Sequence, residues 1–204
     1  MALLKDFSKW VRPFVPMCPE PVLLDAILQS AIEFCERTRC NVEHVDITTA
    51  IGQAIYPIAV QAGYEPSKVL TLKRGIYPLN PTDYRDVEVT PLYSSTTPSE
   101  YFMDADNTLY LYPTPLASEV LTLSLVTNPT VEATEVPDML MTNRRYLTIA
   151  AGAKARLMIE NSPWANPQLG VAEAAAFESG IDREMLRRAK GSGQKRLRTR
   201  GTYF

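Results

Sequence analysis

The sequence predicts an α+β protein: an antiparallel helical bundle with an inserted small antiparallel β domain and an extended C-terminal arm. Three observations predict this fold. Apolar residues recur at helical spacing in residues 1–40 and 137–190, and they alternate with polar residues in residues 41–136. Residues 191–204 show neither pattern. We therefore expect the two outer segments to form the bundle, the middle segment to be the inserted β domain, and the last to be an arm.

Two helices are expected in the first 40 residues. A short entry helix over Ala2–Val11 ends before Pro13 and presents one apolar side, made of Leu3, Leu4, Phe7, Trp10 and Val11. A longer helix runs from Pro19 to Arg39, because proline suits a first helical turn and cations suit the last. Its buried stripe is expected to consist of Leu24, Ile27, Leu28, Ala31, Phe34 and Cys35.

Short segments of strand character, separated by nine prolines, fill the region between Asn41 and Val136. This spacing predicts an antiparallel sandwich or barrel. The region also holds eight of the ten tyrosines, which suit either strand packing or a contact surface. The predicted strands are residues 45–47, 68–73, 86–90, 108–112 and 119–126.

The chain is organised around Pro137–Asn166, which predicts one long uninterrupted helix. Its start is marked by Pro137 and its end by Pro163, since the residue before a proline leaves the α region. Small residues on its surface allow another helix to approach closely. Because glycine is less favourable than alanine inside a helix, we expect close packing to be the reason for Gly152. The small residues are Ala150, Ala151, Gly152, Ala153 and Ala155.

A last helix is expected over Val171–Lys190, after the turn formed by residues 162–167. Gly180 inside it predicts a bend or a break. The arm that follows, Gly191–Phe204, has three glycines and alternating basic residues, so we expect it to be disordered when alone. The apolar side of the helix is expected to consist of Val171, Ala175, Ala176, Phe177, Ile181, Met185 and Leu186.

The charge is distributed unevenly along the chain. The net charge is only −2, but from Arg187 onward there are seven basic residues and no acid. The preceding residues carry 14 basic and 23 acidic side chains, a charge of −9. An acidic body disfavours close wrapping by DNA, because it repels phosphates.

Motifs for enzymatic, metal or cofactor chemistry are missing from the sequence. It contains no GxGxxG, Walker, GxSxG or HExxH motif, and its three cysteines include no CxxC pair. The only histidine, His44, fits a surface or strand-edge position better than a general base. The stretch from Asp104 to Asn107 fits a hairpin turn better than a calcium loop. We expect no enzyme and no cofactor, and no leader peptide or membrane span is evident.

The basic arm has two functional interpretations. It can clasp an acidic protein partner, becoming ordered on binding and anchored by its terminal aromatics, which we favour. Alternatively, it can contact nucleic acid, with arginines on phosphates and aromatics stacked on bases. The candidate binding residues are Lys195, Arg196, Leu197, Arg198, Arg200, Tyr203 and Phe204.

The order of these parts resembles the head-to-tail adaptor proteins of short-tailed bacteriophages. The resemblance covers nearly the whole chain and rests on the succession of an entry helix, a β insertion ending in TLYLYPTP and LTLSLVTNP, the helix VPDMLMTNRRYLTIAAGAKARL, the turn SPWANPQLG and a basic arm.

The resemblance implies a structural virion protein that forms a dodecameric ring under the portal and extends the DNA channel. It implies that Gly191–Phe204 embraces the portal protein and that the β insertion faces outward or toward tail nozzle or fibre proteins. DNA would pass through without sequence-specific binding, and no membrane is involved. The protein would reside in the virion neck, and in the host cytoplasm during assembly. A nucleic-acid-binding accessory protein remains the alternative.

Overall fold

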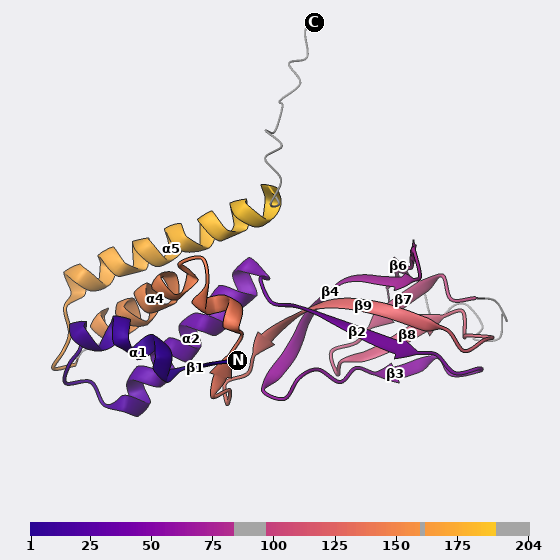
Figure 1. The fold of residues 1–204 in the computed structure, drawn as a ribbon, viewed down its shortest axis with the longest axis horizontal. Coiled ribbons are helices and arrows are strands. Elements are labelled where there is room, and N and C mark those ends of the chain that lie inside the picture. The colour runs from indigo at the N-terminus through magenta and orange to yellow at the C-terminus, as the bar shows by residue number, and fades with distance from the viewer. Residues whose placement is uncertain (84–96, 160–161, 191–204) are drawn as a thin grey trace, which may run out of the picture. The chain divides into compact units, whose positions relative to one another are not determined.

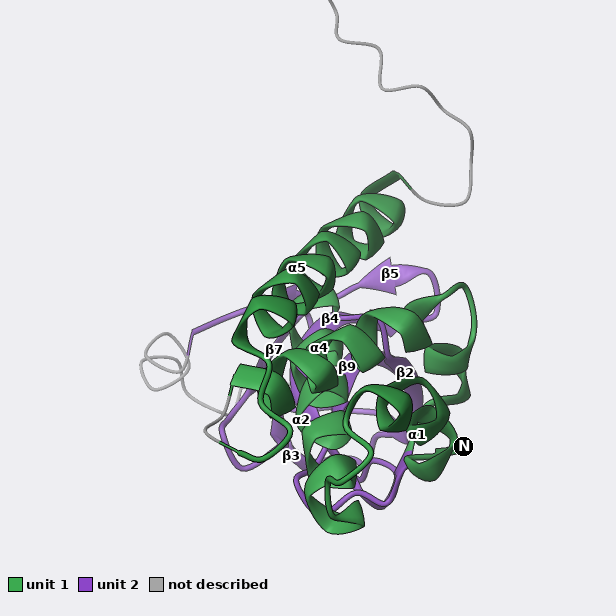
Figure 2. Cartoon of the chain, turned by 90° about the vertical axis from the view of Figure 1, so that its left-hand side faces the viewer, with its two compact units in different colours: residues 1–38, 136–204 green, residues 39–135 purple. Residues whose placement is uncertain are grey.

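The chain forms two compact units in a computed structural model that describes residues 1–83, 97–159 and 162–190 (Figure 1). One unit combines Met1–Thr38 with the residues from Val136 on, and the other is Arg39–Glu135 (Figure 2). The mixed α+β class is confirmed. The predicted strand at residues 86–90 and the arm at residues 191–204 lie outside the described residues.

The first unit is largely helical. It is built from β1 (Ala2–Leu3), α1 (Lys5–Val11), the 3-10 helix η1 (Arg12–Phe14), α2 (Glu20–Thr38), the 3-10 helix η2 (Asp138–Met141), α4 (Arg145–Ile159) and α5 (Pro167–Lys190), with β1 pairing to β10 (Glu135–Val136). The long helix predicted after Pro19 is confirmed as α2. The entry helix predicted over Ala2–Val11 begins only at Lys5, because Ala2 and Leu3 pair with β10 as a strand. Of its predicted apolar side, Leu4, Phe7 and Val11 are buried, whereas Leu3 and Trp10 are not.

The prediction of one uninterrupted helix over Pro137–Asn166 is wrong. A 3-10 turn begins at Asp138, and Asn143 and Arg144 then take left-handed φ values of 55° and 62°. Left-handed residues cannot continue a right-handed helix, so α4 begins only at Arg145. At Asp138 the carboxylate accepts a 2.7 Å hydrogen bond from the N-terminal ammonium group.

The described residues of the second unit form two four-stranded sheets. The strands are β2 (Val42–Thr48), β3 (Ile55–Pro57), β4 (Tyr64–Arg74), β5 (Tyr77–Pro78), β6 (Asn80–Pro81), β7 (Glu100–Met103), β8 (Thr108–Tyr112) and β9 (Val120–Pro129). Their orders are β2-β9-β4-β5 and β3-β8-β7-β6. The long pairs are antiparallel, as predicted, and the two-residue pair β6–β7 is parallel.

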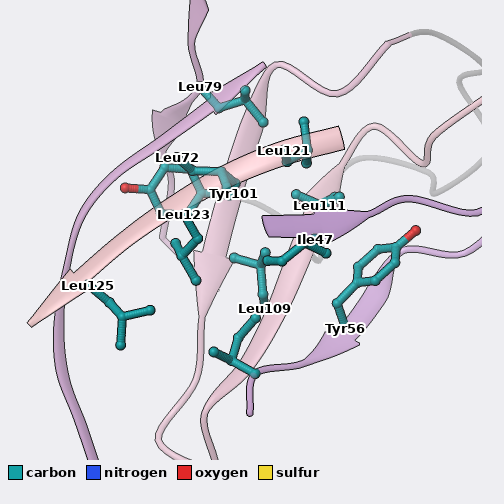
Figure 3. Packing of buried hydrophobic residues seen from close by; sticks show 11 residues of the cluster. Ile47, Tyr56, Leu72, Leu79, Tyr101, Leu109, Leu111, Leu121, Leu123 and Leu125 are labelled. Atoms are coloured by element: carbon teal, nitrogen blue, oxygen red, sulfur yellow. The ribbon is translucent and has the colours of Figure 1, made fainter. Parts of the chain in front are cut away.

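The core of the β unit lies between its two sheets. Leu72, Leu121 and Leu123 come from one sheet, and Leu109 and Leu111 come from the other (Figure 3). Alternate residues of β8 and of the first half of β9 therefore face inward, which is the pattern expected for two packed sheets. The predicted hairpin turn is confirmed, since the Asp104 carboxylate accepts hydrogen bonds from the backbone amides of Asp106 and Thr108.

Candidate interaction surfaces of the helical unit

Helix α4 lies between α2 and α5, and a glycine allows this close packing. A Cβ atom added to Gly152 would come within 2.9 Å of the Phe177 ring on α5 and 3.1 Å of Ser30 Cβ on α2. In both overall views α2 and α5 lie on either side of α4 (Figures 1 and 2). The prediction that this small-residue surface admits a neighbouring helix is confirmed.

Glycines on α5 also bring that helix close to α4. A Cβ at Gly170 would come within 2.8 Å of Ile159, and one at Gly180 within 2.3 Å of Thr148. The prediction that Gly180 bends or breaks the helix is wrong, because α5 runs through it without interruption. The contact with Thr148 supplies the reason for a glycine at this position.

Ion pairs fix the rotation of α5 about its axis. Arg145 on α4 lies 2.5 Å from Glu184, and both side chains are nearly buried, with exposed fractions of 11% and 7%. Lys154 pairs with Glu173 in the same way nearer the start of α5. With Phe177 and Ile181 packed between them, these pairs define the inner face of α5. The opposite side of the helix therefore points away from α4.

A charged network joins α2, α4 and α5 at the edge of a small groove. Arg37 donates two hydrogen bonds to the Glu178 carboxylate, at 2.7 and 2.5 Å, and a third to Glu33, which also accepts from Arg156. The hydrogen bonds with Glu178 raise the pKa of Arg37, and they lower the pKa of Glu178 below its ordinary value. The groove has a volume of about 370 Å³, and its lining includes Gly152 and Ala155.

Replacing Glu178 by glutamine is expected to lower stability only above acidic pH. The pKa of the Glu178 carboxyl is lower in the folded protein than in the unfolded chain. The stability that this carboxylate contributes is therefore complete above the ordinary pKa of 4.5, and it is lost as the pH falls through the folded pKa. The side chain is 54% exposed, so the loss at pH 7 should stay below about 1 kcal/mol. Urea unfolding at pH 7 and pH 3 measures it. Glu36→Gln is the matched control, and an equal loss at both pH values would contradict the prediction.

The outer face of α5 is not covered by any described residue. We define it by Val171, Ala175, Ser179, Asp182, Arg183, Leu186 and Lys190, all of which are exposed. The sequence predicted several of these residues in the core, and that prediction is wrong: Val171 is 64% exposed and Leu186 58%, and Ala175, Ala176 and Met185 are exposed too. Phe177 and Ile181 are the correctly predicted buried residues. The outer face of α5 is thereby left to solvent or to a partner.

A second exposed face lies along α2. Its members recur every three or four residues, and Asp25 and Glu36 give it an acidic character. The α2 outer face is defined by Val22, Asp25, Gln29, Ile32 and Glu36, of which Gln29 and Ile32 are partly buried. Neither outer face was predicted from the sequence as a surface. The glycines at 170 and 180, which share a side of the helix with Phe177, were the signal that could have located the inner face of α5.

Side chains considered for chemistry lie apart from one another. His44 is exposed on the edge strand β2, as predicted, with its Nδ1 2.9 Å from the Ser124 hydroxyl. Cys18, Cys35 and Cys40 are buried. Within residues 1–83, 97–159 and 162–190, no group of three His, Cys, Asp or Glu side chains is placed to hold a metal, and no helix is long and apolar enough to cross a membrane.

In a comparison with protein-family models, the model described as SU10 adaptor protein matches residues 2–200. The chain belongs to this adaptor family. The match confirms the resemblance to phage head-to-tail adaptors and assigns the protein a structural adaptor role in a bacteriophage. A comparison of the adaptor with curated proteins found no match. The predicted binding residues of the arm, Lys195 to Phe204, lie outside the described residues.

Proposed function

We propose that this adaptor forms a ring, a dodecamer, under the portal of a phage head, extends the DNA channel and joins the portal to tail nozzle or fibre proteins. The observation that supports the proposal is the family match over residues 2–200, which includes both units and most of the arm. The protein would act in the virion neck after assembly in the host cytoplasm. It would act as a structural component without catalysis.

The helical unit and the arm form the portal side in this proposal. The arm follows directly from the C-terminus of α5, whose position is fixed by the nearly buried Arg145–Glu184 pair. The disorder expected of the free arm from its sequence would let it search for a partner while its origin at the end of α5 stays fixed. Ordering occurs only when the portal is present, and repetition around a ring multiplies weak contacts. The proposed contacts are Lys195, Arg196, Leu197, Arg198, Arg200, Tyr203 and Phe204.

The β unit would face outward or toward the tail. Its described sheets carry exposed aliphatic side chains at turns, of which Ile51 is 72% and Ile76 82% exposed. Genomic DNA would pass the ring without sequence-specific binding, since a body with a charge of −9 before Arg187 repels phosphates and lets DNA slide.

Deleting Gly191–Phe204 is expected to leave a folded protein that no longer binds portal rings. Light scattering after size exclusion, with the portal protein of the same phage, measures the complex. A matched control replaces Lys68 and Lys73, both exposed in the β unit, by glutamine, which removes cationic charge without touching the arm.

Two outcomes would overturn parts of the proposal. Tight portal binding by the deletion variant would exclude the arm as the portal contact. Absence of any portal complex for the intact chain, together with DNA binding that weakens steeply with salt and needs the arm, would favour a nucleic-acid-binding accessory protein.

A further inference from the structure

We propose that copies of the adaptor join through two different helix faces, the α5 outer face of one copy packing against the α2 outer face of the next. The ring itself rests on the proposed function; the inference assigns the surfaces that close it. Gly152 of α4 is enclosed between Phe177 of α5 and Ser30 of α2, so the two outer faces point away from α4 in different directions. A contact between two different faces of neighbouring copies is the kind that generates rings.

The two faces are of comparable length. The α5 outer face extends about 28 Å from Val171 to Lys190, and the α2 outer face about 21 Å from Val22 to Glu36. Small side chains in the first half of the α5 face, such as Ala175 and Ser179, let a second helix approach within about 8–10 Å.

The helices also run in compatible directions. Within one copy the C-terminal ends of α2 and α5 lie together, since Arg188 donates a 2.8 Å hydrogen bond to the Thr38 carbonyl. Their middles also lie close, since Ser30 of α2 and Phe177 of α5 both adjoin Gly152, so the two helices run in the same sense. In a ring of many copies, neighbours differ by a small rotation, so α5 would meet the next α2 in that same sense. Val22 then lies at the same end as Val171, and Glu36 at the same end as Lys190.

Charge selects this pairing over the symmetric ones. The α2 outer face carries Asp25 and Glu36 and no base, whereas the α5 outer face carries Arg183 and Lys190 with one acid, Asp182. Within the described residues, Asp25, Glu36, Arg183 and Lys190 form no ion pair with one another or with other side chains. Packing α2 against α2 would oppose acids, but packing it against α5 in this direction brings Glu36 close to Arg183 and Lys190. Exposed apolar residues on both faces, Val22, Val171 and Leu186, add area to bury.

Charge reversal tests the contact. One full-length variant combines Asp25→Lys with Glu36→Lys, and a second combines Arg183→Glu with Lys190→Glu. Each alone is expected to raise the concentration needed for assembly at least about tenfold, with and without portal rings, because like charges then meet at every contact. Mixed in equal amounts, the two variants are expected to assemble again. In an alternating ring each altered face meets the other altered face, and each native face a native one.

Controls match the change in charge. Glu132→Lys with Glu135→Lys, and Lys68→Glu with Lys73→Glu, alter exposed residues of the β unit and are expected to assemble normally. Sedimentation velocity and electron microscopy, alone and with portal rings, provide the readout, and circular dichroism checks folding.

The outcomes separate the inference from the proposed function. Suppose that the wild-type protein binds portal rings. If the variants then assemble equally well, or fail to assemble even when mixed, the assigned contact is overturned and the adaptor function stands. Self-association that follows the mixing rule without portal binding supports the contact and contradicts the portal partner. Wild-type protein that stays monomeric under both conditions overturns both.

Discussion

Replacing Glu184 by alanine is expected to lower the free energy of unfolding by about 3–5 kcal/mol. The substitution leaves the Arg145 guanidinium, 11% exposed, without its carboxylate partner 2.5 Å away. The remaining hydrogen bond from Arg145 to the Met139 carbonyl, at 3.0 Å, does not neutralise the charge. The Arg145 Nε atom already has no described hydrogen-bond partner, so the site has little capacity to compensate. A buried unpaired cation is among the costliest changes a small domain can undergo.

Tryptophan fluorescence during urea unfolding measures this effect in the helical unit. Both tryptophans belong to that unit, and Trp10 stacks on Tyr146 of α4 with ring centroids 4.3 Å apart. Glu20→Ala serves as the matched control, since it removes an exposed ion pair with Lys5 and should cost less than about 1 kcal/mol. The double variant Arg145→Met with Glu184→Leu should recover most of the loss. A cost below about 1 kcal/mol for Glu184→Ala would mean that the pair does not hold α5.

The parts of the fold that were predicted correctly are those in which local pattern and tertiary environment agree. Helix α2 has apolar residues at helical spacing between clear end signals, and the structure places it at Glu20–Thr38. Strand β8 coincides with the predicted residues 108–112, because its alternating leucines face a core and its flanking turn residues favour a hairpin. In both elements one side faces the core, so periodicity alone determines the assignment.

The errors occurred where close packing replaces hydrophobic periodicity. The buried side of α5 uses Gly170, Gly180 and the ion-paired Glu184, residue types that periodicity assigns to the surface or to helix breaks. Its exposed side carries Val171 and Leu186, which periodicity assigns to the core. Hydrophobic periodicity does not resolve the orientation, whereas the contact of Gly180 with Thr148 of α4 does.

The candidate surfaces were not predictable for the same reason. The sequence identifies the charges at Asp25 and Arg183, but it does not show which sides of α2 and α5 remain open. The left-handed residues before α4 could not be predicted from the sequence either. Asparagine tolerates a positive φ, but arginine rarely adopts one, so nothing in the sequence marks Arg144 as left-handed. The family relationship, in contrast, could be predicted from the order of segments along the chain. The family match over residues 2–200 confirms it.

Replacing Gly180 by alanine is expected to destabilise the helical unit by at least about 2 kcal/mol, against the direction set by helix propensity. Propensity alone would stabilise the helix by about 1 kcal/mol. The new Cβ, however, would lie 2.3 Å from Thr148 Cγ2 and 2.4 Å from Thr148 Oγ1. Thr148 is buried and β-branched, so its side chain cannot turn away freely. Helices α4 and α5 must therefore move apart.

The sign of the effect makes the measurement decisive. Ala175→Gly on the exposed side of the same helix should cost about 1 kcal/mol, so propensity and packing predict opposite signs at Gly180. Removing the obstructing atoms with Thr148→Ala should reduce the cost of Gly180→Ala, giving a coupling of at least about 1 kcal/mol in a double-mutant cycle. A stabilised Gly180→Ala variant would contradict the close contact with α4. A destabilised variant that shows no coupling would place the strain somewhere other than at Thr148.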